Sequence, residues 1–292
     1  MVKRCLNCMD NYREEEINCP FCGKIAESPS VKILKVGTIL RGRFIVGTQR
    51  GQRKNDISYI GWDELFSRKV MILELFPEKI VERTEDGSIR VLDGLQEKME
   101  EARREFIKEC EKLILLDGVP GVLNMLCVFE ERGSAYGIYE YPGEITLRDV
   151  LKNRGIFSVD EAEWLMSHLS VTLNYTHSIN LYHGNISLDN CYVCPSGDVR
   201  LGMFHSEIGK SSRERIARDI INLAELCGCI LMGLDLWNTG SMNDKWQYIS
   251  KYVSVDAAKL FFEIFSRTKI PESIQRFVDL FTGEATIELY GG

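Results

Sequence analysis

The sequence predicts an α+β protein with a strand-rich lobe, then a helical lobe, and a small cysteine module before both. Two Cys-x-x-Cys pairs lie within the first 22 residues. Apolar runs bounded by turn residues continue to about residue 141, with one amphipathic helical pattern among them over 95–116. After residue 142 apolar residues recur at intervals of three and four, as in helices that bury one face.

Length and composition set the outer bounds. The 292 residues allow one two-lobed domain with a large core plus a small accessory module. A formal net charge of −7 offers no overall basic field for nucleic acid or for an anionic membrane surface. No apolar run approaches the roughly 20 residues that cross a bilayer, and the N-terminus has no apolar signal segment. The sequence therefore predicts a cytoplasmic protein without a membrane span.

The cysteine module has the ligand spacing of a zinc ribbon. Two pairs are separated by ten residues, and their members are Cys5, Cys8, Cys19 and Cys22. Such turns let four thiolates converge on one ion. The alternative, redox-active or disulfide pairs of a secreted module, is disfavoured because no export signal precedes them. We expect a structural Zn²⁺ in a ribbon over 1–27, followed by a linker over 28–36.

The helical lobe carries recognisable helix boundaries. Helix signals cover 146–153 and 158–178, and Ser158 with Glu161 is expected to form a capping box. Three further helices are expected towards the C-terminus, at about 245–252, 255–266 and 274–281.

An ordered set of motifs runs through both lobes. In chain order they are a hairpin pattern over 43–62 with its turn expected at Gly51–Asp56, the strand Lys69–Pro77, the helical pattern 95–116, the pair Glu140-Tyr141, the loop His183–Asn190 and a helix start at Asp219. In order and spacing this set resembles the eukaryotic-like serine/threonine protein kinases of bacteria.

The resemblance implies a two-lobed protein-kinase-like domain over 37–284. Its N-lobe, 37–141, would be an antiparallel sheet with helix αC, and its C-lobe, 142–284, would be helical. Residues 285–292 remain as a tail without interpretation.

The resemblance breaks at the positions where the family carries its chemistry. Leu73 stands in place of the phosphate-binding lysine, Asn185 in place of the catalytic aspartate, and Met203 in place of the magnesium-binding aspartate. An amide has no titratable acceptor near neutral pH, so Asn185 is not a base. Glu109 and Asn190 keep the positions of the αC glutamate and of the second metal ligand. We interpret Asn190 as a hydrogen-bonding brace of its loop, because one neutral amide does not hold magnesium.

The segments that would hold a nucleotide are changed as well. Of the three glycines of the family's phosphate loop only Gly51 is present, with Arg53 and Asp56 at the other two positions. Asp56 would repel a triphosphate. Met71 replaces the small residue that packs on adenine, and Tyr139 at the gatekeeper position narrows the cleft. We therefore expect neither ATP nor Mg²⁺ to bind.

Only residues 206–218 separate Met203-Phe204-His205 from Asp219, so the family's activation loop and peptide-docking segment are largely missing. Asp219 matches the family's aspartate that braces the catalytic loop. We interpret the chain as a catalytically inactive pseudokinase, a protein-interaction or regulatory scaffold module in signalling. An active kinase or a signalling complex is the kind of partner this implies.

One alternative belongs to another class of protein. A divergent nucleotide-binding enzyme would use Arg53 or Lys54 with Glu109 and Asn190 as its site, and it would need a second acidic metal ligand. The nearby candidates for that ligand are His205 and Glu207, and neither is well placed. Binding of nucleic acid by the ribbon fits poorly, because the ribbon carries several acidic residues against few basic ones.

Overall fold

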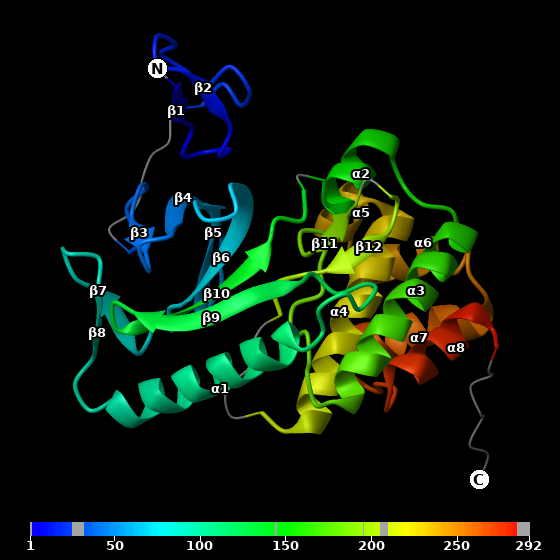
Figure 1. Ribbon diagram of the computed structural model, residues 1–292. Coiled ribbons are helices and arrows are strands. Elements are labelled where there is room, and N and C mark those ends of the chain that lie inside the picture. Colours follow the sequence, from blue (N-terminus) through cyan, green and yellow to red (C-terminus); the bar gives the residue numbers. More distant parts are fainter. Residues whose placement is uncertain (1, 25–31, 144, 195, 205–209, 285–292) are drawn as a thin grey trace. The chain divides into compact units, whose positions relative to one another are not determined.

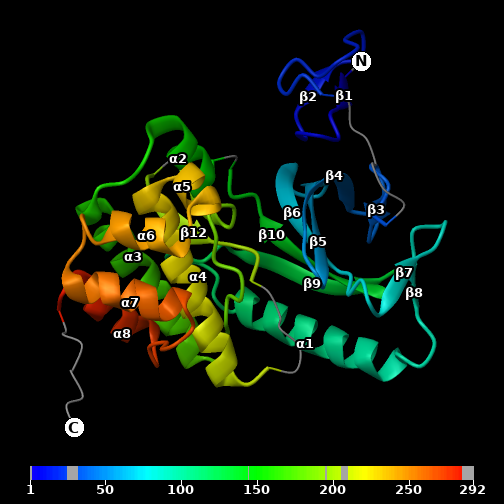
Figure 2. The ribbon, with the colours of Figure 1, turned by 180° about the vertical axis from the view of Figure 1, so that it is seen from behind.

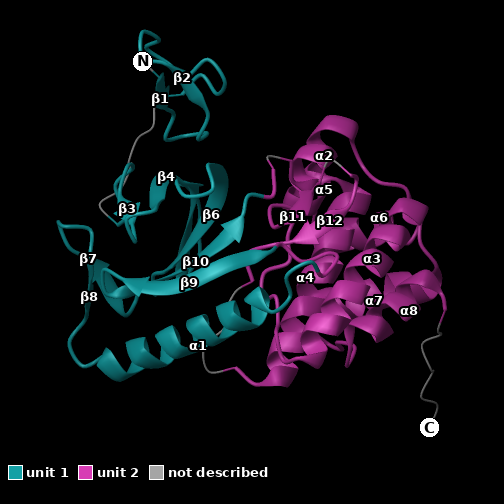
Figure 3. Ribbon diagram, in the orientation of Figure 1, with its two compact units in different colours: residues 1–118, 124–141 teal, residues 119–123, 142–292 magenta. Residues whose placement is uncertain are grey.

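The chain divides into two units, and each is described by itself (Figure 3). The first contains residues 1–118 and 124–141, and the second contains residues 119–123 and 142–292. In this computed structural model the described residues are 2–24, 32–143, 145–194, 196–204 and 210–284. The expected linker 28–36 lies partly outside them, and the tail 285–292 lies wholly outside them.

A six-stranded antiparallel sheet forms the centre of the first unit (Figure 1). In spatial order its strands are β3 (Ile39–Leu40), β4 (Phe44–Gln52), β5 (Asp56–Asp63), β6 (Arg68–Leu75), β10 (Ser134–Glu140) and β9 (Met125–Glu131). Helix α1 (Gln96–Ile114) packs on β9 and β10 and buries the apolar stripe that includes Met99, Phe106 and Cys110. The predicted sheet and its long helix are thus confirmed.

The hairpin between β4 and β5 is tighter than the sequence predicts. The expected turn covered Gly51–Asp56, but Gly51 pairs with Ser58 and β5 already begins at Asp56, so only residues 53–55 connect the strands. The carbonyl oxygen of Asn55 accepts the N–H of Phe76 at 2.7 Å. Because this contact joins the turn to the chain that follows β6, it could not be anticipated from local turn signals.

Two small hairpins complete the first unit. β1 (Val2–Arg4) pairs with β2 (Asn11–Arg13) in the cysteine module, and β7 (Val81–Arg83) pairs with β8 (Ile89–Val91) between β6 and α1. Figures 1 and 2 show β1 and β2 beside the strands of the large sheet.

A buried charge on β6 joins distant parts of this unit. The carboxylate of Glu74 accepts hydrogen bonds from the hydroxyls of Tyr59 and Tyr136, each at 2.8 Å, and from the guanidinium of Arg83 at 2.6 Å. The side chains of Glu74 and Arg83 are 0% and 2% exposed. Burial, and then the Glu74 charge, raise the pKa of both tyrosines far above its ordinary value. Sequence reasoning assigned this cluster no role.

The second unit is helical. Its elements are α2 (Leu147–Arg154), α3 (Val159–Ser178), β11 (Cys191–Val193), β12 (Val199–Leu201), α4 (Ser212–Met232), α5 (Leu234–Thr239), α6 (Met242–Ile249), α7 (Val255–Phe265) and α8 (Ile274–Thr282). Helix α4 packs against α3, α5, α6, α7 and α8, which makes it the central helix of the unit. None of the described helices is long and apolar enough to span a bilayer.

Capping chemistry sets the helix starts of this unit. Ser158 and Glu161 form the predicted capping box before α3. Helix α6 begins at Met242, three residues before the expected position, because Ser241 caps it together with Asp244. The start of α6 is therefore set by its capping residues, whereas the apolar pattern alone predicted a later start.

Candidate functional site

The lysine and alanine positions of β6 are filled by apolar side chains. Leu73 and Met71 are 2% and 5% exposed. Leu73 lies opposite Gly137, and Met71 lies opposite Tyr139, both on β10. In the family, β6 would carry a lysine whose ammonium group contacts two phosphates. Here the same position carries the buried, uncharged side chain of Leu73.

Tyr139 is the largest side chain at this place in the sheet. It is fully buried, and its hydroxyl has no hydrogen-bond partner among the described residues. Burial raises the pKa of this phenol well above its ordinary value, so it stays neutral. The register places Met71 directly opposite Tyr139, and the narrowing of the nucleotide pocket by these two side chains stays a prediction.

Arg53, in the β4–β5 connection, forms an ion pair with Asp56 at the start of β5. The guanidinium Nε of Arg53 lies 2.7 Å from a carboxylate oxygen of Asp56, and the backbone N–H of Arg53 donates to the carbonyl of Asp56 at 2.8 Å. The side chain of Asp56 is 5% exposed. Arg53 therefore neutralises the acid beside it at the place where the family has glycine.

Glu109 lies half-buried on α1, next to Cys110. Burial raises the pKa of the Cys110 thiol well above its ordinary value, and the Glu109 charge adds to the rise. The apolar Leu73 cannot form the ion pair that the αC glutamate makes in the family.

In the second unit, Asp219 of α4 holds the loop that begins at His183. Its fully buried carboxylate accepts the backbone N–H groups of His183 at 2.9 Å and Gly184 at 2.6 Å, and it lies 2.8 Å from Nε2 of His177. Gly184 has a φ of 73°, a conformation that glycine adopts without strain. The expected bracing role of Asp219 is confirmed.

Two amide side chains, one from the loop and one from α4, also hydrogen-bond to the loop backbone. The Nδ2 group of Asn190 donates to the carbonyl of Asn185 at 2.9 Å, which agrees with the interpretation of Asn190 as a brace. Asn222 of α4 donates to the carbonyl of Gly184 at 3.2 Å. The loop thus keeps its shape through α4 while its base position holds a neutral amide.

Met203 follows β12 and is 3% exposed. Its φ of 59° is rare for a residue with a side chain. Gly202 before it has no room for a side chain, since a Cβ would lie 2.8 Å from Leu123 and Tyr192. The turn therefore presents a thioether where the family has a carboxylate. His205 and Glu207 lie outside the described residues.

Four sulfur atoms gather in the N-terminal module and form the only cluster of three or more metal-ligating side chains among the described residues. All lie within 4.8 Å of one another, and the pairs Cys5–Cys22 and Cys8–Cys19 are 3.7 and 3.6 Å apart. A tetrahedral ion with metal–sulfur bonds of about 2.3 Å needs sulfurs about 3.8 Å apart. The four cysteines therefore fit Zn²⁺.

Asn7 supports this cluster between its first two cysteines. Its backbone N–H donates to Sγ of Cys5 and its side-chain amide donates to Sγ of Cys22, each at 3.4 Å. Burial raises the pKa of Cys22, but hydrogen bonds, first that from Asn7, outweigh it and bring the pKa to about 7. The hydrogen bond from Asn7 thus favours the thiolate of Cys22, the form that binds metal, whereas burial raises the pKa of the Cys5 and Cys8 thiols. The Cys-x-x-Cys spacing drew attention to the ligands and not to this residue.

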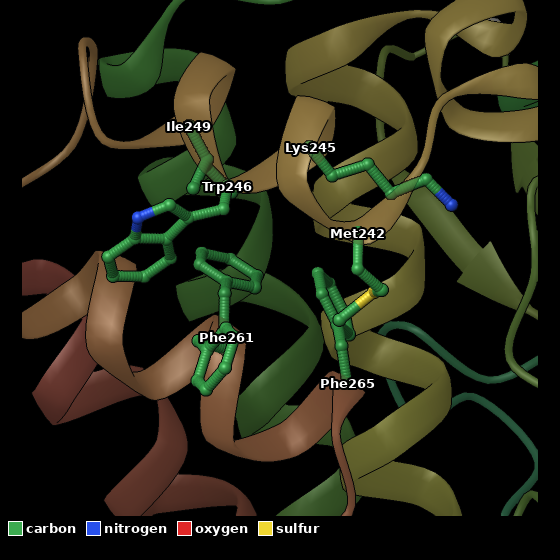
Figure 4. A pocket seen from close by; sticks show the side chains of 7 residues that line it. Met242, Lys245, Trp246, Ile249, Phe261 and Phe265 are labelled. Carbon is green, nitrogen blue, oxygen red and sulfur yellow. The ribbon is translucent and has the colours of Figure 1, made fainter.

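The described residues of the second unit line at least two pockets. One, of about 190 Å³, lies between the loop residues 186–188 and the helices α4 and α5, with Arg148 and Glu225 among its polar lining. The other is apolar and lies between α6 and α7, where Figure 4 shows the rings of Trp246, Phe261 and Phe265.

Comparisons with known proteins identify the fold of the chain. A family profile described as "Protein tyrosine and serine/threonine kinase" matches residues 79–212. A solved structure, "PpkA-294 apo form", superposes with a TM-score of 0.60 at 19% sequence identity and covers 86% of this chain and 99% of that chain. The fold is that of a protein kinase. The first unit corresponds to the sheet lobe of a kinase fold, and the second corresponds to the helical lobe.

Curated proteins with similar sequences are kinases too. "Putative serine/threonine-protein kinase A" of Trypanosoma brucei brucei is 25% identical over 173 residues, which is 57% of this chain and 39% of that protein. "Sperm motility kinase 2B" of Mus musculus is 30% identical over 95 residues, 32% of this chain and 19% of that protein. The matched segments thus span well under half of these relatives.

Proposed function

We propose that the chain is a pseudokinase, a kinase fold that transfers no phosphate and acts as a protein-interaction or regulatory module in signalling. The observation that carries the proposal is the identity of three residues, Leu73, Asn185 and Met203, in an otherwise kinase-like fold. Each removes a different part of the chemistry.

The loss of Lys and Asp side chains removes the electrostatic part of phosphoryl transfer. Catalysis of this reaction depends on positioning and on cations that neutralise charge on the phosphates. Leu73 brings no charge, and Met203 offers a sulfur that is a poor ligand for a hard cation such as Mg²⁺. Asn185 accepts no proton from a substrate hydroxyl.

Two of the polar groups that the alternative nucleotide site would use support the proposal, because each is engaged within its own unit. Arg53 binds Asp56, and Asn190 binds the carbonyl of Asn185. These contacts stabilise local structure, and they argue against the makeshift nucleotide site that Arg53 and Asn190 would otherwise offer.

The retained scaffold supports a binding role. Asp219 and Asn222 hold the loop in shape although its base is gone. The pocket of about 190 Å³ beside this loop gives the second unit a concave surface that a protein partner could contact. A Zn²⁺ held by the four cysteines would be structural, since all four ligand positions are filled by protein.

A nucleotide titration tests the proposal. The zinc-loaded chain should keep its melting temperature at millimolar ATP, with or without Mg²⁺ or Mn²⁺, and calorimetry should record no binding heat. A binder at a hundredfold excess over its dissociation constant would gain about 2.7 kcal/mol of stability. A metal-dependent rise in melting temperature that is reduced by Asn190→Ala would contradict the absence of nucleotide binding.

A further inference from the structure

Asn7 contacts the sulfur cluster and the large sheet at once. While its N–H groups donate to Cys5 and Cys22, its side-chain oxygen accepts from Oγ1 of Thr48 at 3.0 Å. Its carbonyl oxygen accepts from the guanidinium of Arg50 at 2.6 Å. Both Thr48 and Arg50 belong to β4, so a single residue connects the metal ligands with a strand of the kinase fold.

Further contacts extend this interface over three strands. The N–H of Thr48 donates to the carbonyl of Leu6 at 2.9 Å, Nζ of Lys69 on β6 lies 2.9 Å from Asp10, and the guanidinium of Arg4 lies 3.3 Å from the ring centre of Trp62 on β5. The cysteine module therefore rests on β4, β5 and β6 as a docked part of the first unit.

Gly47 of β4 gives independent evidence of this docking. A Cβ at this position would lie 2.3 Å from Cε of Met9 and 2.5 Å from the carbonyl oxygen of Leu6. The second of these atoms is backbone and cannot move without displacing the module. Met9 is fully buried in the contact. The strand thus lacks a side chain at the point where the module approaches it.

We propose that the cysteine module is a metal-dependent clamp on β4, in which metal binding and docking to the sheet are one coupled event. Asn7 is the positioning residue of this clamp. It hydrogen-bonds two of the four sulfurs, and at the same time it hydrogen-bonds Thr48 and Arg50 of β4. The inference rests on the assignment of Zn²⁺ to the four cysteines, and it is independent of the loss of phosphotransfer.

Coupling of this kind is reciprocal. If metal stabilises docking by some factor, docking must raise metal affinity by the same factor, commonly about 5–150-fold. A change on β4 that touches no cysteine should therefore weaken zinc binding, and removal of zinc should loosen β4. Neither effect is expected of a ribbon that is merely tethered to the sheet.

The test uses the full chain and competition with a chromophoric zinc chelator. Gly47→Ala and Arg50→Ala should each raise the dissociation constant for Zn²⁺ by about fivefold or more. Arg50 is exposed, so its variant keeps the fold even where Gly47→Ala disturbs the sheet. Asn7→Ala should act in the same direction. Asn11→Ala, an exposed asparagine on β2, is the matched control and should leave zinc affinity unchanged.

Hydrogen exchange supplies the second readout. Chelation of zinc should speed exchange of the β4 amides, including that of Thr48, while α7 in the second unit remains protected. Unchanged zinc affinity in both β4 variants, or unchanged β4 exchange after chelation, would overturn the clamp. Failure of the unaltered chain to bind zinc would overturn the zinc assignment and the clamp together, and the nucleotide titration, run on the metal-free chain, would still test the pseudokinase proposal separately.

Discussion

Replacement of Glu74 by glutamine is expected to lower the free energy of unfolding of the first unit by about 3–5 kcal/mol, because it leaves the Arg83 guanidinium buried without a counter-charge. Glutamine has nearly the same size as glutamate, so the decrease in the free energy of unfolding would come from the lost charge and not from a cavity. Hydrogen exchange of the slowest amides in β6 and β10 measures it, since every 1.4 kcal/mol corresponds to about a tenfold change in rate.

A neighbouring ion pair provides the control. Glu82 pairs with Arg90 on the β7–β8 hairpin, and the two side chains are 45% and 71% exposed. Glu82→Gln changes the same chemistry in solvent, so exchange in β6 and β10 should stay as in the unaltered protein. If both substitutions changed exchange in β6 and β10 equally, the stabilising effect of Glu74 would not depend on its burial.

Substitution of Asp219 by alanine should destabilise the second unit by about 3–5 kcal/mol. The change leaves the backbone N–H groups of His183 and Gly184 buried without an acceptor, at about 1–3 kcal/mol each, and also removes the partner of His177. Chemical denaturation followed by the fluorescence of the tryptophans in this unit measures the loss.

Asp189 offers the comparison for this prediction. It lies in the same loop, but its carboxylate is 58% exposed and binds Arg148 on the surface. Asp189→Ala should therefore cost about 1 kcal/mol or less. A loss for Asp219→Ala that is no greater than for Asp189→Ala would disprove the bracing role of Asp219.

The fold could be predicted from sequence because its motifs combine local pattern with order. The strand of Leu73, the helix of Glu109 and the loop of His183 each carry a recognisable pattern, and their succession resembles that of a protein kinase fold. The same spacing identified the four cysteines, which the structure brings together. Helix starts such as Ser158 followed from local capping chemistry.

What could not be predicted depends on contacts between distant segments. Glu74 meets Tyr59, Arg83 and Tyr136, three residues from three different strands, and no local pattern announces their meeting. The docking of the cysteine module on β4 is of the same kind. Gly47 looks like an ordinary strand glycine until Met9 and Leu6 are seen against it.

The sequence motifs indicate where the catalytic residues of a kinase are replaced, and the structure shows what surrounds the replacements. Leu73 and Met71 are buried in the sheet, and Asn190 is engaged by its own loop. These surroundings are those of residues that serve structure, which is the physical basis for proposing an inactive kinase fold.

Transfer of labelled γ-phosphate from ATP is the measurement that tests this account most directly. The zinc-loaded chain, incubated with Mg²⁺ or Mn²⁺ and with basic and acidic protein substrates, should incorporate no more label into itself or into them than heat-unfolded chain does. Asn190→Ala and Glu109→Ala should behave identically to the unaltered protein. Label incorporation that exceeds this background and is lost in either variant would contradict the account, because it would require the kinase site to be active without its lysine, its base and its metal-binding aspartate.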